Sequence, residues 1–477
     1  MSPFIGRKTE LSILEDQLKK RVASLVVVRG RRRIGKSRLI EEFSKAYQSY
    51  IFTGIPPTKE TTKQSQINEF ARQLKLLFSI PNIHFEDWGD LFWYLADKLP
   101  KKRVILVFDE ISWMGSKDPD FLGKLKMAWD LYFKKNNELM LILCGSVSAW
   151  IEKNIIAGTG FVGRISCTLT LGELSLSESN EFFRANQHLS NYEKFKLLAV
   201  TGGIPRYLEE MRIELSAEQN IKKTCFSSQG FLFNEFNQVF HDIFLSRSTN
   251  YYKTMLSLIE QNQDPLRLSR YIEADLNSVI SNQFNELVLA GFLARDYTWD
   301  LKSQKISKLS TYRLKDNYCR FYLKYIAPHR HQIEAGSFEK KSLTSLPGWS
   351  TIMGFQFENL ILNNRLKIWA HLEISPDEIV FDNPFFQNKT SKQNGCQIDY
   401  LIQTKFCNLY VCEIKFSSTE IKHTVINEVQ DKISNLKKPR GFSCRPILIH
   451  VNGITDKVRD SGFFSHIIDF GQLLQIS

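Results

Sequence analysis

The chain has 477 residues, of which 43% are hydrophobic and 24% charged, with eight cysteines and a formal net charge of +12. This length predicts about three domains, the charged fraction argues against wholesale disorder, and the cysteines match no C-x-x-C or zinc spacing, which favours free thiols. No apolar run approaches the roughly 20 residues of a membrane helix, and no secretion signal opens the chain, so we expect a cytoplasmic protein without membrane contact. The positive surplus lies mostly before residue 335, and it fits a nucleic-acid partner or simple solubility equally well.

The first motif lies between a predicted strand and a predicted helix. Residues 25–29 form a short apolar run, and the next eight are Gly30-Arg31-Arg32-Arg33-Ile34-Gly35-Lys36-Ser37, followed by an amphipathic stretch from Arg38. This is G-x-x-x-x-G-K-S in the context that the motif requires. The glycines allow a tight turn whose N–H groups point at phosphates. Lys36 would reach the β- and γ-phosphates and Ser37 would bind Mg²⁺. The arginines either add charge near the nucleotide or face solvent.

A pair of acids follows a second buried strand. Val104 to Phe108 are apolar, and Asp109 and Glu110 come directly after them. Asp109 is expected to hold the magnesium shell, and Glu110 to orient and deprotonate the attacking water. An exposed acidic turn is the alternative for an isolated pair of this kind.

Two polar positions further on are candidates for nucleotide contact. A third apolar run, residues 139–144, ends in Gly145-Ser146. Ser146 is placed either to contact the γ-phosphate or to cap the next helix. Arg164 precedes a fourth strand-like run, and it is either a charge-stabilising finger or a surface arginine. An arginine finger acting on a second copy would imply a homo-oligomer.

These motifs, together with Phe4-Ile-Gly-Arg7-x-x-Glu10 and Thr201-Gly-Gly-Ile-Pro-Arg-Tyr-Leu208, resemble the archaeal-type ATPases of the AAA+/STAND assemblage. The resemblance implies an ATP-binding αβα core at 1–170 and a helical lid at 171–215. It also implies that the opening segment lies near the adenine and that Arg206 contacts the γ-phosphate from the lid. Residues 216–247 read as a helical linker.

A winged helix-turn-helix is predicted at 248–330. Three helical stretches, at 254–261, 268–275 and 279–295, precede two strands that end at Leu314. Such a module often reads DNA with its third helix. The third stretch here has no Lys or Arg before Arg295, so packing against protein is an equal alternative.

The C-terminal part carries a second cluster of acids. Glu358 lies on a predicted helix, Asp399 opens a predicted strand, and Glu413 and Lys415 lie late in the next strand. Antiparallel pairing of the two strands would bring Asp399 and Glu413 together, with Lys415 on the same face as Glu413. Acids and a lysine in this pattern are typical of a magnesium site that acts on phosphodiesters.

This pattern resembles the PD-(D/E)xK nuclease superfamily, in the version attached to archaeal-type ATPases, over residues 335–477. The resemblance implies that Asp399 and Glu413 are metal ligands, Lys415 is the catalytic lysine and Glu358 is an accessory acid at the metal. Gln430 is a possible assisting residue. An ordinary hairpin with a surface E-x-K, and a retained fold without activity, both stay open.

The sequence therefore predicts an α/β multidomain protein. It would comprise a P-loop αβα ATPase core, a helical lid, a winged helix-turn-helix and an α/β restriction-endonuclease-like domain. The expected function is ATP hydrolysis with Mg²⁺, acting on or with DNA, and nucleotide control of the nuclease-like domain. The alternative is a nucleotide-driven switch or scaffold whose C-terminal domain only binds nucleic acid or protein. A small-molecule kinase would need an acceptor pocket that the sequence does not identify.

Overall fold

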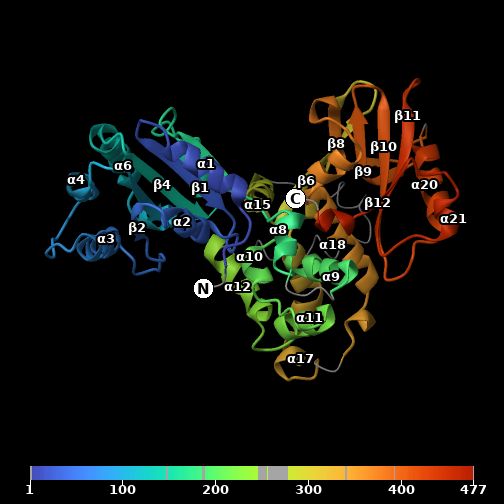
Figure 1. The fold of residues 1–477 in the computed structure, drawn as a ribbon, viewed down its shortest axis with the longest axis horizontal. Helices are drawn as coiled ribbons and strands as arrows, with labels where there is room; N and C mark the ends of the chain where they lie inside the picture. The colour runs from blue at the N-terminus through green and yellow to red at the C-terminus, as the bar shows by residue number, and fades with distance from the viewer. Residues whose placement is uncertain are drawn as a thin grey trace. The chain divides into compact units, whose positions relative to one another are not determined.

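The computed structural model describes residues 3–146, 149–184, 189–244, 255, 278–338, 341–391 and 393–475. The chain divides into two compact units, Met1–Leu174 and Ser175–Ser477, and Figure 1 traces it from the blue N-terminus to the red C-terminus. The division falls within the lid predicted at 171–215, so the lid helices belong to the second unit.

In chain order, the first unit contains α1 (Lys8–Leu18), β1 (Ser24–Gly30), α2 (Lys36–Ser44), β2 (Gln48–Thr53), α3 (Lys63–Phe78), α4 (Trp88–Lys98), β3 (Val104–Asp109), α5 (Ile111–Met114), α6 (Phe121–Leu131), β4 (Leu139–Ser146), α7 (Ala149–Ile151) and β5 (Cys167–Leu171). The strands form one parallel sheet in the order β2-β3-β4-β1-β5. The predicted parallel core is thus confirmed. The central strands contain continuous apolar runs, at residues 25–28, 104–108 and 139–144, because a parallel sheet is covered by helices on both faces.

Aromatic side chains fill the core on one face of this sheet. Phe108 of β3 packs edge-on against Phe70 of α3, with ring centroids 5.4 Å apart, and stacks on Phe92 of α4 at 5.7 Å. Helix α2 contacts β1 and β4 and buries Leu39 and Ile40. Successive strand residues point to opposite faces, so each strand serves both layers.

The second unit contains α8 (Leu176–Glu181), α9 (Asn191–Thr201), α10 (Pro205–Leu208), α11 (Ala217–Cys225), α12 (Phe231–Phe244), α15 (Ser278–Leu289), β6 (Leu293–Asp300), β7 (Lys305–Leu314), α16 (Asn317–Phe321), α17 (Arg330–Glu334), α18 (Trp349–Asn363), α19 (Arg365–His371), β8 (Ile379–Gln387), β9 (Cys396–Thr404), β10 (Asn408–Phe416), α20 (Thr424–Asn435), β11 (Ser443–Val451), α21 (Asp456–Arg459) and β12 (His466–Asp469). Its main sheet has the order β12-β11-β10-β9-β8. Strands β8, β9 and β10 pair antiparallel, and β10, β11 and β12 pair parallel. The hairpin predicted for the acids is present as β9 and β10.

The β6–β7 hairpin shares a hydrophobic core with the main sheet of the second unit. Trp299 of β6 stacks on Phe381 at 5.2 Å and meets Phe385 edge-on at 5.1 Å. Its indole N–H donates to Gln403 Oε1 at 2.6 Å. The boundary predicted between 330 and 335 therefore separates elements that pack together. Two of the three helices predicted for a winged domain fall almost entirely outside the described residues, and the third is α15.

The lid helix α9 packs against α18 of the same unit. Phe195 lies 5.4 Å from the ring of Phe357 and 5.4 Å from that of Phe470. Asn317 donates to the carbonyls of Leu198 and Gln356, at 3.4 and 3.1 Å. These contacts join the lid helix to the helix that carries Glu358.

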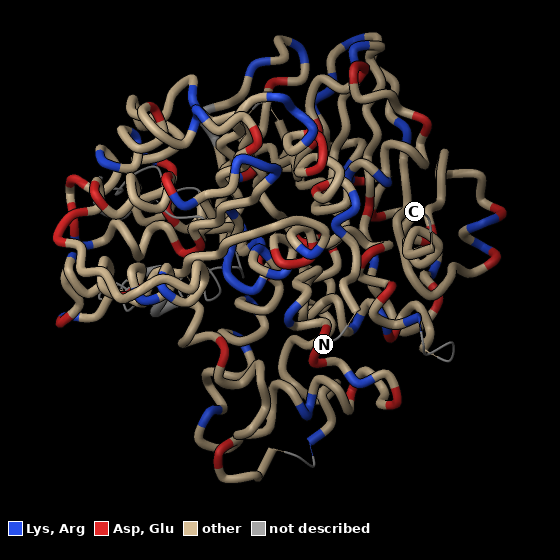
Figure 2. Tube along the Cα trace, turned by 60° about the vertical axis from the view of Figure 1, so that its left-hand side comes forward, with Lys and Arg blue, Asp and Glu red and all other residues tan. Residues whose placement is uncertain are grey.

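Charged residues are distributed along the whole described chain. Figure 2 shows Lys and Arg interleaved with Asp and Glu along the trace. The net charge therefore does not by itself mark one face for a polyanion. Among the described residues, no helix is both long and apolar enough to cross a membrane.

Candidate functional site

The loop after β1 is shaped by close backbone approach. A Cβ on Gly30 would lie 2.8 Å from the carbonyl oxygen of Leu171 and 2.9 Å from Ile34 Cγ2, so only glycine fits there. Gly35 has φ 90° and Arg33 has φ 69°, both left-handed. Gly35 also precedes the first residue of α2. The loop thus ends at a helix N-terminus, where free N–H groups and the helix dipole favour phosphate.

Lys36 is buried and folds back over this loop. Its Nζ donates to the carbonyl oxygens of Gly30 at 3.1 Å and Arg31 at 3.2 Å. These are neutral acceptors, so the charge of the ammonium is not cancelled by an acid in these contacts. A phosphate in the loop would meet a cation that is already positioned.

The side chains of Ser37 and Asp109 are in contact, although β4 lies between β1, which precedes the loop of Ser37, and β3, which ends in Asp109. Ser37 Oγ donates to Asp109 Oδ2 at 2.9 Å, and Asp109 Oδ1 accepts the backbone N–H of Glu110 at 3.0 Å. Asp109 ends β3, and Ser37 lies in the first turn of α2, after the loop that follows β1, so both are at the carboxyl edge of the parallel sheet, where ligands bind in such sheets. A hydroxyl and a carboxylate in contact are chemically suited to Mg²⁺.

Glu110 follows in a left-handed conformation, with φ 52°. Burial raises the pKa of its carboxyl and Asp109 adds to the rise, whereas Lys36 and Arg32 lower it. A carboxylate with a raised pKa beside Ser37 and Asp109 is suited to act as a general base.

Arg7 braces the phosphate loop, a role that the sequence did not indicate. Its Nη2 donates to the carbonyls of Ile34 at 3.1 Å and Gly172 at 2.6 Å, and its Nη1 pairs with Glu10 at 2.8 Å. The side chain is buried. The G-R-x-x-E motif was the available signal, and the resemblance connected it only with the adenine.

The remaining loop residues have mixed environments. Arg31 and Ile34 are buried, Arg32 lies 6.0 Å from the ring centroid of Trp113, and Arg38 lies 4.0 Å from Glu41 on α2. Ser146 is paired in register with Gly30, which brings the end of β4 beside the loop. The helix-cap alternative for Ser146 involves Val147 and Ser148, which lie outside the described residues.

Arg164 lies at the amino-terminal edge of the sheet, because it precedes β5. It forms a two-pronged ion pair with Asp130 of α6, at 2.9 and 2.8 Å, and this guanidinium holds the pKa of Asp130 well below its usual range. The phosphate loop follows the carboxyl end of β1, which is parallel to β5. Arg164 thus lies near the edge of the sheet opposite the phosphate loop, and its assignment as a charge-stabilising finger stays a prediction.

Arg206 belongs to the second unit. It pairs with Glu210 at 2.6 Å and with Glu209 at 3.4 Å, and its guanidinium lies 4.5 Å from the ring centroid of Phe231. Its assignment as a phosphate sensor stays a prediction.

In the second unit, the strand register brings Asp399 and Glu413 together. Cys412 pairs with Tyr400 in the β9–β10 ladder, so the next pair along is Glu413 with Asp399. Asp399 Oδ2 accepts the backbone N–H of Ile414 at 3.0 Å. Burial raises the pKa of Glu413, and the neighbouring Asp399 raises it further, against the effect of two lysines.

Those two lysines come from different elements. Lys415 Nζ lies 3.0 Å from Glu413 and 2.7 Å from Glu428 of α20. Lys432 of α20 bridges the two acids, at 3.2 Å from Asp399 and 2.5 Å from Glu413. Burial lowers the pKa of Lys432, but the two carboxylates outweigh it and raise the pKa. The sequence did not single out Lys432. It pointed to Gln430, which is exposed on the same helix.

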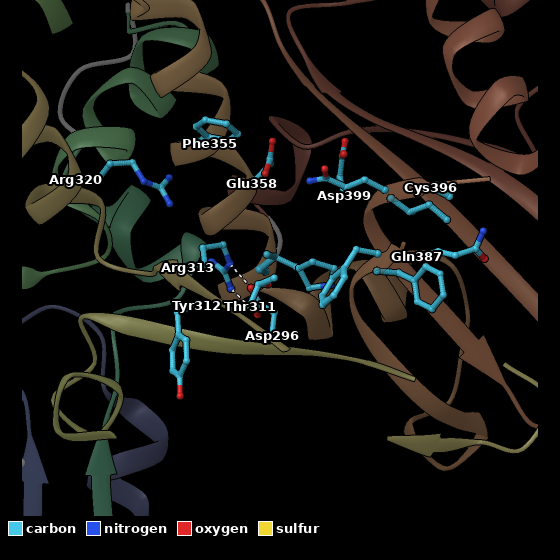
Figure 3. A pocket seen from close by; sticks show the side chains of 17 residues that line it. Asp296, Thr311, Tyr312, Arg313, Arg320, Phe355, Glu358, Gln387, Cys396 and Asp399 are labelled. Carbon is cyan, nitrogen blue, oxygen red and sulfur yellow. Dashed lines mark hydrogen bonds and ion pairs between the residues drawn. The ribbon is translucent and has the colours of Figure 1, made fainter. Parts of the chain in front are cut away.

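Glu358 reaches toward this acid pair from α18. Figure 3 shows its carboxyl and that of Asp399 beside one cavity. Burial raises the pKa of Glu358, and the charge of Asp399 adds to the rise. Among the described residues, no three His, Cys, Asp or Glu side chains converge as metal ligands. A divalent cation here would bind Asp399 and Glu413, with water or backbone oxygens completing its shell.

Together, the fold of the first unit and the geometry around its loop define a P-loop ATPase domain. In agreement, residues 4–211 match the family described as "ATPase domain predominantly from Archaea". The amino-terminal part of the chain is thus similar to ATPase domains of the archaeal type. An uncharacterised protein of Methanocaldococcus jannaschii is 25% identical over 366 residues, which cover 75% of this chain and 76% of that protein.

Solved structures show weaker similarity. A Walker-type ATPase of Pyrococcus abyssi overlaps 67% of this chain and 96% of its own, at 16% identity and a TM-score of 0.49. The ORC2 protein of Aeropyrum pernix overlaps 71% and 97%, at 14% identity and a TM-score of 0.42. A STAND protein with a tetratricopeptide repeat sensor from Pyrococcus horikoshii overlaps 78% and 50%, at 18% identity and a TM-score of 0.31.

Proposed function

We propose that this protein binds and hydrolyses ATP with Mg²⁺ at the loop of residues 30–38, and that the nucleotide state controls a phosphodiester-cleaving site around Asp399. The contact between Ser37 Oγ and Asp109 at 2.9 Å carries the first part. It joins the two side chains that would hold the metal, directly beside a cationic Lys36 and a carboxyl with a raised pKa.

Each residue of the nucleotide site has a distinct task in this proposal. Backbone N–H groups of the loop and of the first turn of α2 bind the phosphate oxygens. Lys36 leaves its two carbonyl partners and places its charge on the β- and γ-phosphates. Glu110 orients a water and takes its proton. Bound magnesium would neutralise phosphate charge, with Ser37 and Asp109 as its protein ligands.

The second site is proposed to cleave DNA. Two carboxylates on neighbouring strands, with Lys415 beside them, provide metal ligands and a cation for a phosphodiester. The lid helix α9 supports the coupling between the sites, because it packs on α18, the helix that carries Glu358. A lid that responds to nucleotide would bias the arrangement of that helix. DNA is chosen over other phosphodiesters on the family resemblance alone.

The test of the nucleotide site compares Lys36→Ala with Lys45→Ala. Lys45 follows the same helix, its side chain is 62% exposed, and it contacts only Glu42 in the described interactions. Lys36→Ala should abolish phosphate release from ATP and weaken the binding of a fluorescent ATP analogue, while Lys45→Ala should match the wild type. Equal ATP hydrolysis by both variants would remove the proposal.

A second candidate function is a nucleotide-driven switch or scaffold whose C-terminal domain binds without cleaving. The position of Lys432 favours it, because its ammonium lies between the two carboxylates that would hold a metal. On this reading, Asp399→Ala leaves the biological function intact and Lys36→Ala abolishes it. A phenotype that is lost in Asp399→Ala would exclude the switch.

A further inference from the structure

A cavity of about 340 Å³ opens beside Asp399, within the second unit. Figure 3 shows it between the β6–β7 hairpin, α18 and the β8–β9 hairpin. The residues Phe355, Phe385 and Phe386 bring aromatic rings to its lining, whereas the Tyr312 ring points away from the cavity in Figure 3 and lies 4.5 Å from the ring of Phe284. Its volume lies in the range of pockets that enclose a small ligand.

Arg320 lines this cavity and forms no ion pair within the described part of the chain, although the nearby Glu358 favours its charge. Its side chain is 2% exposed. Its Nη2 donates to the carbonyl of Leu314 at 2.6 Å and its Nη1 to the Gln356 amide oxygen at 3.3 Å. Its Nε–H has no hydrogen-bond partner in the described part of the chain. The other arginine of the cavity, Arg313, is neutralised by Asp296, at 2.7 and 3.2 Å.

A buried guanidinium that donates only to neutral acceptors is unfavourable, because it has lost its hydration without gaining an ion-pair partner. Burial lowers the pKa of Arg320 to about 9, so the group remains charged at neutral pH. An anion that entered the cavity would supply the missing charge, and Arg–phosphate contacts are among the strongest hydrogen bonds in proteins.

We propose that the cavity binds a single nucleotide unit, with its phosphate at Arg320 and its base against the aromatic wall. Flat aromatic rings stack on any base. A plain phosphate or carboxylate ligand would not need an aromatic wall. Asp399 belongs both to the cavity wall and to the acid pair with Glu413. The inference therefore deepens the proposed phosphodiester site and rests on it.

The cavity defines the substrate class of that site. One enclosed nucleotide must leave its stack and its partner base before it can enter. Single-stranded DNA or an unpaired end is then the preferred form, and a closed duplex is a poor one. A free mononucleotide carries the same phosphate and base, so it is the second possible ligand of the cavity.

The experiment measures binding in EDTA, where no metal-dependent cleavage occurs, and in excess ADP, which keeps the phosphate loop filled. The full chain is titrated into a fluorescent single-stranded oligonucleotide and into a hairpin duplex with a blunt end. Deoxyadenosine monophosphate serves as competitor. Gln397→Trp obstructs the cavity from an exposed lining position, and Gln332→Trp makes the same change at an exposed site on α17.

Gln397→Trp should weaken single-strand binding roughly tenfold relative to wild type and Gln332→Trp, the scale of one lost charged contact. Phe355→Leu should weaken it as well, since it keeps an apolar wall but removes the stacking ring. If the mononucleotide competes, a free nucleotide is sufficient to fill the cavity. If it does not compete, the cavity binds a nucleotide only as part of a DNA strand. Equal binding by all variants, or equal binding of single strand and blunt duplex, overturns the inference.

The result separates this inference from the proposed cleavage. If Gln397→Trp weakens binding but the wild-type protein has no nuclease activity, the proposed cleavage is refuted and the nucleotide cavity stands. Cleavage that depends on Asp399, with binding insensitive to Gln397→Trp, removes only the cavity assignment.

Discussion

Glu110 is the residue whose surroundings define the chemistry of the first unit most closely. Replacing it by Gln keeps the shape of the side chain and removes the base. ATP hydrolysis should fall roughly 100-fold or more, while nucleotide binding through the loop persists. Phosphate release and binding of a fluorescent ATP analogue, measured on the same protein, check this. Loss of both together would show that Glu110 supports the loop and not the chemical step.

The pH dependence of hydrolysis reports on the same group. Glu110 must be ionised to take a proton, so kcat should decline as the pH falls through its pKa. Because burial raises that pKa above the ordinary value of 4.5, the decline begins at a higher pH than for an exposed glutamate. A pH profile of wild-type kcat is the measurement. A profile that remains flat down to the ordinary value would contradict the assignment.

Arg7 should matter to the shape of the loop. Arg7→Met removes donors to the Ile34 and Gly172 carbonyls, and it should cost about 2 kcal/mol of unfolding free energy and weaken ATP binding. Lys8→Met, at an exposed neighbour, is the control. Urea unfolding and ATP titration provide the two readouts. An Arg7→Met protein as stable and as tightly binding as the control would refute the bracing role.

At the scale of residues, the motifs predicted which side chains form the sites. They did not predict the hydrogen-bond and ion-pair partners of those side chains. The spacing of Lys36 and Ser37 predicts a phosphate loop. The two motifs together predict that Ser37 and Asp109 share a magnesium ion, but their direct hydrogen bond depends on the course of the intervening chain, which the motifs do not specify. Lys432 escaped prediction for the same reason, because its approach to Asp399 depends on how α20 packs on the sheet.

At the scale of elements, the β6–β7 hairpin is the feature that the sequence misrepresents. The sequence predicted its two strands, as the wing of a helix-turn-helix module. Two such strands are found both in a solvent-exposed wing and in a hairpin that packs on a sheet. The contacts of Trp299 with Phe381 and Phe385 distinguish the packed hairpin from an exposed wing. A local sequence pattern cannot predict these contacts, because the three residues are far apart in the chain.

Trp299→Ala should therefore destabilise the whole C-terminal sheet, by about 3–5 kcal/mol. The indole leaves a cavity in the shared core, and Gln403 loses its hydrogen bond. Phe406→Ala, at a ring that is 62% exposed in the β9–β10 turn, should change stability little. Hydrogen exchange at the amides of β8 and β9 is the measurement. Faster exchange confined to β6 and β7 would show that the hairpin is independent of the C-terminal sheet.

At the scale of the whole molecule, five predicted segments become two compact units. The parallel core could be predicted, because strand, loop and helix signals follow one another within the first unit. The assignment of the lid to the second unit could not. Phe195 is one apolar residue on a predicted helix, and its partners, Phe357 and Phe470, are far along the chain.

The measurement that tests the central claim most directly is cleavage of plasmid and single-stranded DNA with Mg²⁺, with and without ATP. It compares wild type, Lys36→Ala, Asp399→Ala and the control Asp377→Ala, an acid that is 74% exposed in the same unit. The account predicts cleavage that is lost only in Asp399→Ala, and that responds to ATP only when Lys36 is present. Wild-type protein that hydrolyses ATP but leaves every DNA intact would contradict it and leave a nucleotide-driven switch.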